Sequence, residues 1–226
     1  MLAPHQFWQE IHAPGTFSPD PEAGFVDLYP ALFHDGRQLA LPIRVLPGGA
    51  DRAVASLIIN QASFAVEDAL GAAMAEHARA FAPDVIVGVP TLGLPLAANV
   101  ARRLGHTRMV ALGTSRKFWY DDDLSEPLKS ITTPGGEKRI YLDPRMLPLL
   151  EGRRFALVDD VVSTGASLAS VLRLLRKAGL SPEAVVVAMV QGRKWEAQAA
   201  GVSVRGAIET PLLKREADGR WRPDAA

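Results

Sequence analysis

Two acids and a short hydroxyl-bearing loop follow one another around residue 160. Asp159 and Asp160 end an apolar run. Ser163, Thr164 and Gly165 come just after them and directly before a helix-forming stretch. In open α/β sheets, ligands bind at the carboxyl ends of the strands. The first turn of a helix offers unpaired N–H groups and the positive end of its dipole. Since the glycine lets an anion approach the backbone, the pattern predicts a phosphate site.

An acid pair beside an anion site indicates a ligand that carries hydroxyl groups as well as phosphate. A ribose 5-phosphate fits, because its O2 and O3 hydroxyls can donate to Asp159 and Asp160 while its phosphate binds the loop. The alternative is that Ser163 and Ser167 only cap a helix and the acids are a solvated strand end. The order of strand, acid pair, loop and helix favours the ligand site. No Gly-Lys-Ser/Thr follows a glycine-bearing loop, which excludes a P-loop, and a dinucleotide fingerprint is absent.

Apolar runs alternate with helical patterns through the middle of the chain. Such alternation predicts an α/β fold with a mostly parallel sheet flanked by helices on both faces. We expect strands at 84–90, 108–112, 154–159, 183–190 and 202–208, and helices at 60–82, 94–104 and 166–178.

Three segments stand outside this alternation. Residues 1–56 are rich in proline and glycine, which predicts loops and short strands in an N-terminal subdomain. Residues 113–143 are polar, charged and aromatic and longer than an ordinary connection, so they are a flexible flap or disordered. The polar tail 216–226 is expected to fray. The length fits a single domain over 1–226.

The bulk composition is that of an ordinary globular protein. The 25 basic residues balance the 25 acidic ones, which argues against a nucleic-acid binder with a general basic surface. The absence of cysteine excludes disulfides, thiolate catalysis and cysteine-ligated metals. We see no signal peptide and no run long enough for a membrane helix. We therefore expect a cytoplasmic protein with no membrane or nucleic-acid partner.

The segment from Val158 to Ser167 resembles the 5-phosphoribosyl-1-pyrophosphate (PRPP) signature of the type I phosphoribosyltransferases. The surrounding parts are similar in order: a strand and helix at 85–104, the flap, the signature, and the stretch Met-Val-Gln-Gly-Arg at 189–193. The chain looks most like the adenine and xanthine phosphoribosyltransferases. The resemblance implies a type I phosphoribosyltransferase-like fold with a flexible hood that closes over PRPP and excludes water.

The resemblance also assigns roles in binding PRPP. Asp159 and Asp160 would be the catalytic pair that holds the ribose hydroxyls. Magnesium would arrive with PRPP, held by its hydroxyls and pyrophosphate rather than by a protein metal site. The family further implies a homodimer. The residues that would bind the 5′-phosphate are Ser163, Thr164, Gly165, Ala166 and Ser167.

The loop Pro90-Thr91-Leu92-Gly93 falls where the family binds pyrophosphate. That loop often contains a non-proline cis peptide, for which the bond between Pro90 and Thr91 is the candidate. An ordinary strand-to-helix turn is the alternative. The adenine enzymes usually present Ser-Arg-Gly here, so Leu92 stands in place of a cation.

Two flap residues could supply the missing positive charge. Arg116 and Lys117 suit a developing pyrophosphate, either from the same subunit or from a dimer mate. The alternative is a solvated flap with Phe118 and Trp119 as its hydrophobic anchor.

One residue of the sequence bears on which base would be bound. The 6-oxopurine enzymes generally have an aspartate where this chain has Ser163, which leaves adenine first and xanthine next. The segment 1–56 would build a lid over the base. Four of its residues could stack on the base or belong to local core: Phe25, Tyr29, Phe33 and His34.

The resemblance implies a purine phosphoribosyltransferase of purine salvage and nucleotide metabolism, which transfers the phosphoribosyl group of PRPP to a purine base and releases pyrophosphate. The alternative is a non-catalytic PRPP-binding regulator of the same fold. Leu92 favours the regulator, whereas the lack of a basic helix-turn-helix or nucleic-acid arm disfavours it.

Overall fold

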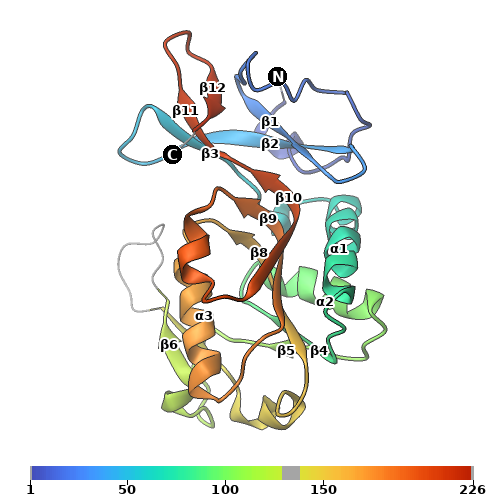
Figure 1. Ribbon diagram of the computed structural model, residues 1–226, viewed down its shortest axis with the longest axis vertical. Coiled ribbons are helices and arrows are strands. Elements are labelled where there is room, and N and C mark those ends of the chain that lie inside the picture. The colour runs from blue at the N-terminus through green and yellow to red at the C-terminus, as the bar shows by residue number, and fades with distance from the viewer. Residues whose placement is uncertain (1, 129–137, 225–226) are drawn as a thin grey trace.

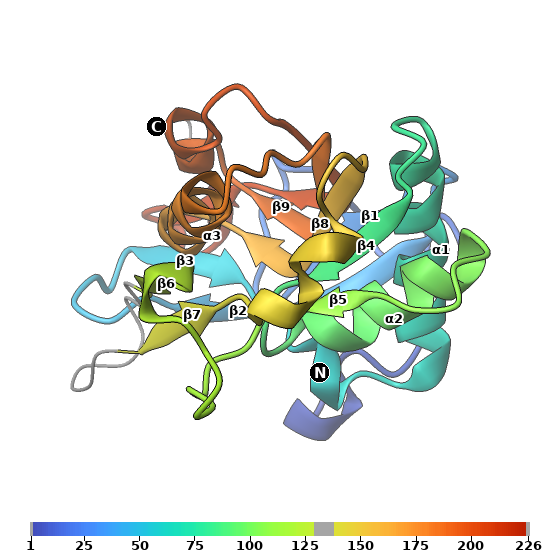
Figure 2. The same ribbon diagram turned by 90° about the horizontal axis from the view of Figure 1, so that it is seen from below.

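A parallel sheet forms the centre of the computed structural model, which describes residues 2–128 and 138–224. Within those residues the sheet has five strands in the order β10-β9-β8-β4-β5, all parallel. Helices α1 and α2 lie on one side of it and α3 on the other (Figures 1 and 2). The expected α/β class is confirmed. The bounds are β4 Val85–Gly88, β5 Val110–Ala111, β8 Phe155–Val162, β9 Ala184–Gln191, β10 Ser203–Thr210, α1 Phe64–Arg79, α2 Gly93–Arg103 and α3 Ala166–Lys177.

Strand β8 shows why this sheet is covered on both faces. Ala156 and Val158 belong to the core shared with α1 and α2, whereas Phe155 and Leu157 belong to the core shared with α3. All four are essentially inaccessible to solvent. Successive side chains of a strand point to opposite faces, so a continuous apolar run needs a cover on each side.

A second sheet lies over the carboxyl ends of the parallel strands, and we call it the roof (Figure 1). It is antiparallel, in the order β1-β2-β3-β11-β12. The expected short strands of the N-terminal segment are therefore present, but the other end of the chain completes their sheet. The bounds are β1 Leu28–Leu32, β2 Gln38–Val45, β3 Arg52–Ala55, β11 Leu212–Arg215 and β12 Trp221–Pro223.

The prediction that the tail frays is wrong for its described part. Trp221 is only 6% exposed and packs with Phe25, Ala53 and Leu213 in a small core of the roof. The tail's polar composition conceals this one large apolar side chain, and burying an aromatic ring of that size holds the strand in the sheet.

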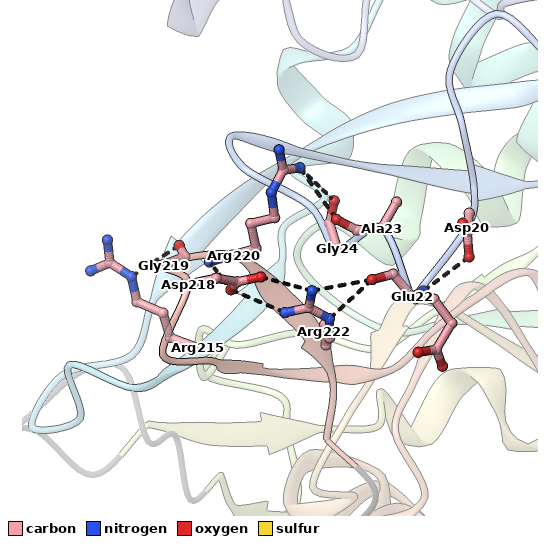
Figure 3. A network of polar contacts seen from close by, with 9 residues as sticks. All are labelled: Asp20, Glu22, Ala23, Gly24, Arg215, Asp218, Gly219, Arg220 and Arg222. Atoms are coloured by element: carbon pink, nitrogen blue, oxygen red, sulfur yellow. Dashed lines mark hydrogen bonds and ion pairs between the residues drawn. The ribbon is translucent and has the colours of Figure 1, made fainter.

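Polar contacts also join the two ends of the chain (Figure 3). The Arg222 guanidinium donates to the Glu22 carbonyl at 3.1 and 3.2 Å and pairs with Asp218 at 2.8 Å. Arg220 donates to the carbonyls of Ala23 and Gly24 at 3.3 and 3.4 Å. The arginines of the β11–β12 hairpin thus hold the loop that precedes β1.

The described part of the expected flap contains a small hairpin. Strand β6 (Ser125–Pro127) pairs antiparallel with β7 (Arg139–Tyr141), and residues 129–137 lie outside the described residues. Glu126 in β6 pairs with Lys177 and Arg173 of α3 at 2.7 and 3.1 Å, which anchors the hairpin to that helix. The 3-10 helices are η1 Pro4–Gln6, η2 Ile59–Gln61, η3 Asp122–Leu124, η4 Pro144–Leu149 and η5 Lys194–Gln198. None of the helices in the described ranges has the length and apolar character that a membrane span requires.

Candidate functional site

A cavity of about 570 Å³ lies where the carboxyl ends of β8 and β9 meet the roof. Asp159, Asp160 and the whole loop 163–167 line it. From the roof side it is lined by Val54 and Leu212, among others. The volume is in the range of small-molecule sites. The structure therefore brings the predicted ribose and 5′-phosphate residues together around one cavity.

The two acids are coupled neighbours. The backbone N–H of Asp160 donates to Oδ1 of Asp159 at 2.8 Å. Burial, and next the charge of Asp160, raise the pKa of Asp159 well above its usual value, and burial raises the pKa of Asp160. Two carboxylates in a shielded place repel each other unless donors or a cation face them. The pair is therefore suited to a ligand that brings hydroxyl donors.

The phosphate loop reaches α3 through Gly165. This residue has a φ of +78°, and a Cβ on it would lie 2.7 Å from Cβ of Gln198 and 2.9 Å from Cα of Trp195. Only glycine fits both the left-handed backbone and the close approach of η5. Gly165 is itself the N-cap residue and no side chain caps the helix, so Ser163 is not a helix cap. Apart from a long contact of 3.4 Å from the Ala166 N–H to the Thr164 hydroxyl, the first turn of α3 stays open towards the cavity.

The predicted pyrophosphate loop lies against the acid pair. A Cβ on Gly93 would meet Cα of Asp159 at 2.7 Å and its Oδ1 at 2.8 Å. The bond between Pro90 and Thr91 is cis, as the family resemblance predicted. Thr91 is exposed, whereas Leu92 is half-buried against the core shared with α1 and α2. None of the three loop residues lines the cavity, although Gly93 lies directly against Asp159, which does.

The predicted flap cations lie outside the cavity. Arg116 pairs with Asp122 through two hydrogen bonds of 2.7 and 3.1 Å, and Lys117 is exposed. Of the flap aromatics, Phe118 is 91% exposed, while the Trp119 indole donates to Asp143 at 3.2 Å. Trp119 is therefore an anchor of the flap, and Phe118 is not.

The arginine next to that anchor sets the charge of Asp143. Arg145 pairs with Asp143 at 2.6 Å and its guanidinium lies 4.3 Å from the centre of the Trp119 ring. The hydrogen bond from Arg145 is the largest cause that lowers the pKa of Asp143 to about 2. Asp143, which holds the Trp119 indole, thus stays ionised at any physiological pH.

The aromatic residues of the lid segment belong to the roof. Phe25 and Phe33 are buried, and the Phe25 and Tyr29 rings lie 4.9 Å apart in an edge-on arrangement. His34 is exposed. None of the four lines the cavity, which favours the local-core alternative for the first three.

Three polar residues of the cavity wall were not assigned from the sequence. Ser56 follows β3, Gln191 ends β9 and Lys194 begins η5. Gln191 lies in the stretch 189–193 that carries part of the family resemblance, so that stretch was the available signal. Ser56 and Lys194 have no local signal, because only the docking of the roof brings them to the wall.

The acid pair fits a metal that arrives with its ligand. Residues 2–128 and 138–224 hold no group of three or more histidines, aspartates or glutamates that could bind a metal ion. Once ionised, the two carboxylates would attract a Mg²⁺ ion that keeps its oxygen shell from water and the phosphates of its ligand.

The comparison with protein families identifies the fold. The family model described as "Phosphoribosyl transferase domain" matches residues 61–208. The chain belongs to this family. Its parallel sheet flanked by helices is the type I phosphoribosyltransferase fold, and the chain is similar to the purine enzymes of that family.

Curated relatives of the chain include enzymes and a regulator. An adenine phosphoribosyltransferase of Mycobacterium avium is 31% identical over 131 residues, 55% of this chain and 64% of the relative. A xanthine phosphoribosyltransferase of Bifidobacterium adolescentis is 27% identical over 66% of this chain and 75% of the relative. Transcriptional regulator GfcR 1 of Methanosarcina barkeri is 32% identical over 58% of this chain and 55% of the relative. The match thus spans just under two thirds of the length of the Mycobacterium enzyme.

Solved structures agree on the fold. The adenine phosphoribosyltransferase of Giardia lamblia, solved with 9-deazaadenine, has a TM-score of 0.56 and 22% identity and covers 74% of this chain and 93% of its own.

Proposed function

We propose that the chain binds PRPP in the cavity between the roof and the parallel sheet and transfers its phosphoribosyl group to a purine base. The supporting observation is the cavity itself, in which the acid pair and the open start of α3 lie side by side. Adenine is the favoured base and xanthine the next. Pyrophosphate would leave, and a nucleoside monophosphate would remain.

The acids and the loop divide the binding work. Asp159 and Asp160 accept hydrogen bonds from the two ribose hydroxyls, which offsets the burial that raises both pKa values and the charge of Asp160 that further raises that of Asp159. The N–H groups of Gly165, Ala166 and Ser167 bind the 5′-phosphate, helped by the dipole of α3. Mg²⁺ bound with PRPP would neutralise charge on the pyrophosphate. The ribose is thereby held with its C1 towards the incoming base.

The roof would shield the bound ligand from water. Val54 and Leu212 cover the cavity from above, and a dry site strengthens the interactions of the acids and phosphate with their partners. The hood of the family corresponds to residues 113–143, part of which lies outside the described residues. We propose that it closes over the pyrophosphate.

The charge of the pyrophosphate still needs a protein cation, since Leu92 has none. We propose that Arg116 and Lys117 supply it. Arg116 would have to leave Asp122 for this, and both of these side chains are exposed, so the pair is weak. A dimer mate could equally present the two residues, as the family resemblance implies.

A second candidate function is regulation by PRPP without transfer. Leu92 in the pyrophosphate loop and the similarity to GfcR 1 both favour it. It predicts tight PRPP binding and no chemistry.

A direct assay separates the two. The protein is incubated with Mg²⁺, PRPP and adenine, xanthine, hypoxanthine or guanine in turn, and pyrophosphate release is measured. Release with adenine supports the transferase, and binding of PRPP with no release for any base supports the regulator.

The acid pair is tested by an Asp160→Asn variant. We expect PRPP affinity to fall roughly 10- to 150-fold, the loss of a hydrogen bond to a charged group. The matched control is Asp84→Asn, which removes an acid paired with Arg154 at the opposite end of β4. Calorimetric titration measures both. Equal affinity in the two variants would contradict the role given to Asp160.

A further inference from the structure

Gln191 has one unused hydrogen-bonding atom at the edge of the cavity. Its side chain is 6% exposed, and its Nε2 donates to the Ala55 carbonyl at 2.8 Å. None of the described residues donates a hydrogen bond to its Oε1. This oxygen is not fully buried, so it keeps some exposed surface. Because Gln191 lines the cavity and is otherwise enclosed, the cavity is the space onto which Oε1 opens.

Gln38, a second buried glutamine, has hydrogen bonds at both ends of its side-chain amide, unlike Gln191. It lies in β2 and is 1% exposed. Its Oε1 accepts from the Phe17 N–H at 2.8 Å and its Nε2 donates to the Phe17 carbonyl at 2.9 Å. Buried polar groups in folded proteins are nearly always satisfied in this way. Gln191 satisfies only its donor end, which leaves its acceptor for a ligand.

The roof fixes which end of the amide faces the cavity. Turning the Gln191 amide over would place Oε1 against the Ala55 carbonyl, and two acceptors cannot form a hydrogen bond. The cavity is therefore offered an oxygen and not an NH₂ group. Two other polar side chains of this wall differ from Gln191 in what they offer a ligand. Lys194 can only donate a hydrogen bond, and the Ser56 hydroxyl can donate or accept one.

We propose that Gln191 determines which purine the site accepts, by receiving a hydrogen bond from an exocyclic amino group of the base. The inference rests on the proposed function and deepens it. Gln191 ends β9, and in the pairing of β9 with β8 Asp159 lies opposite Val187, four residues before Gln191, with Gln191 and the two acids that would hold the ribose lining the cavity. A base attached to that ribose and directed towards the roof meets the fixed oxygen. An amino group would pair with it, and an oxo group at the same place would face another acceptor.

Three nucleoside monophosphates test the proposal without turnover, because no pyrophosphate is present. Adenosine, purine-riboside and inosine 5′-monophosphates share the ribose and phosphate and differ at one base position, which carries NH₂, H and oxo, respectively. We expect adenosine monophosphate to bind about 2- to 12-fold more tightly than the purine riboside, the range of a neutral hydrogen bond. Inosine monophosphate should bind no better than the purine riboside. Calorimetric titration gives the three dissociation constants.

A Gln191→Met variant should bind adenosine and purine-riboside monophosphates equally, because the acceptor is gone and the volume is nearly kept. The matched control is Gln38→Met, which alters a buried glutamine outside the cavity wall and should keep the preference. Thermal melting checks that both variants are folded.

Each outcome has one meaning. If the wild-type protein binds adenosine and purine-riboside monophosphates equally, the role of Gln191 is overturned, whether or not the variant folds. The role is also overturned if the Gln191→Met variant still prefers adenosine monophosphate. If none of the three nucleotides binds, the phosphoribosyl site itself is wrong, and this inference goes with it.

Discussion

Two adjacent carboxylates, Asp159 and Asp160, are the residues on which the proposed chemistry depends. Without a ligand their position is unfavourable, because burial penalises the charged form of both and the charge of Asp160 further penalises that of Asp159. A group whose pKa is raised by folding binds protons more readily in the folded than in the unfolded state. Stability then falls as the pH rises from the ordinary value of 3.8 through the folded-state pKa.

An Asp159→Asn variant should therefore be more stable than the wild-type protein at pH 7 and bind PRPP more weakly. The melting temperature should rise by about 2–4 °C for each kcal/mol of penalty removed. The difference should shrink as the pH falls and vanish below 3.8, where Asp159 is protonated in both states. Melting curves over this pH range measure it. A variant less stable than wild type at pH 7 would mean that the acid is not under electrostatic strain.

Among the elements, the start of α3 decides whether the loop can hold a phosphate. The helix must begin where β8 delivers the acids, and its first turn must stay uncapped. Gly165 meets both demands while η5 packs directly against it. The same packing places Lys194, the first residue of η5, at the cavity wall.

Replacing Gly165 by alanine should cost roughly 2–4 kcal/mol of unfolding free energy, from the positive φ and the clash with Gln198 and Trp195. Gly152→Ala is the matched control, because Gly152 also has a positive φ but a Cβ there would meet no atom within 4 Å. The control should lose only about 1–2 kcal/mol. Denaturant unfolding compares them. Equal losses would show that the contact with η5 is not tight.

In the whole molecule, the proposed ligand lies between two sheets that come from different parts of the chain. The parallel sheet brings the acids and the loop, and the roof brings the cover and the partner of Gln191. A ligand bound at their junction stabilises both, since it binds only when they are docked.

PRPP with Mg²⁺ should therefore raise the melting temperature of the whole chain. At a hundred times the dissociation constant the gain is about 2.7 kcal/mol, which corresponds to roughly 5–11 °C for a chain of this size. The Asp160→Asn variant at the same ligand concentration should gain only about 0.3–1.4 kcal/mol, at most about half the wild-type shift. An unmoved transition in the wild-type protein would exclude the site.

The sequence by itself determined the parts that depend on neighbouring residues. The run from Val158 to Ser167 contains its own strand end, acids, loop and helix start, so its chemistry can be read without knowing the rest of the fold. The alternation of apolar strands with helices likewise specified the parallel sheet, because buried strands and amphipathic helices have local periods.

Only the tertiary structure decided how the site is closed. Strand β3 pairs with β11 from the far end of the chain, and the polar tail carries Trp221 into the roof core. The free oxygen of Gln191 exists because its amide is held by Ala55. Pairing between distant strands has no local signature, since any two short apolar strands can hydrogen-bond, and the choice between them is made by the packing of the whole chain.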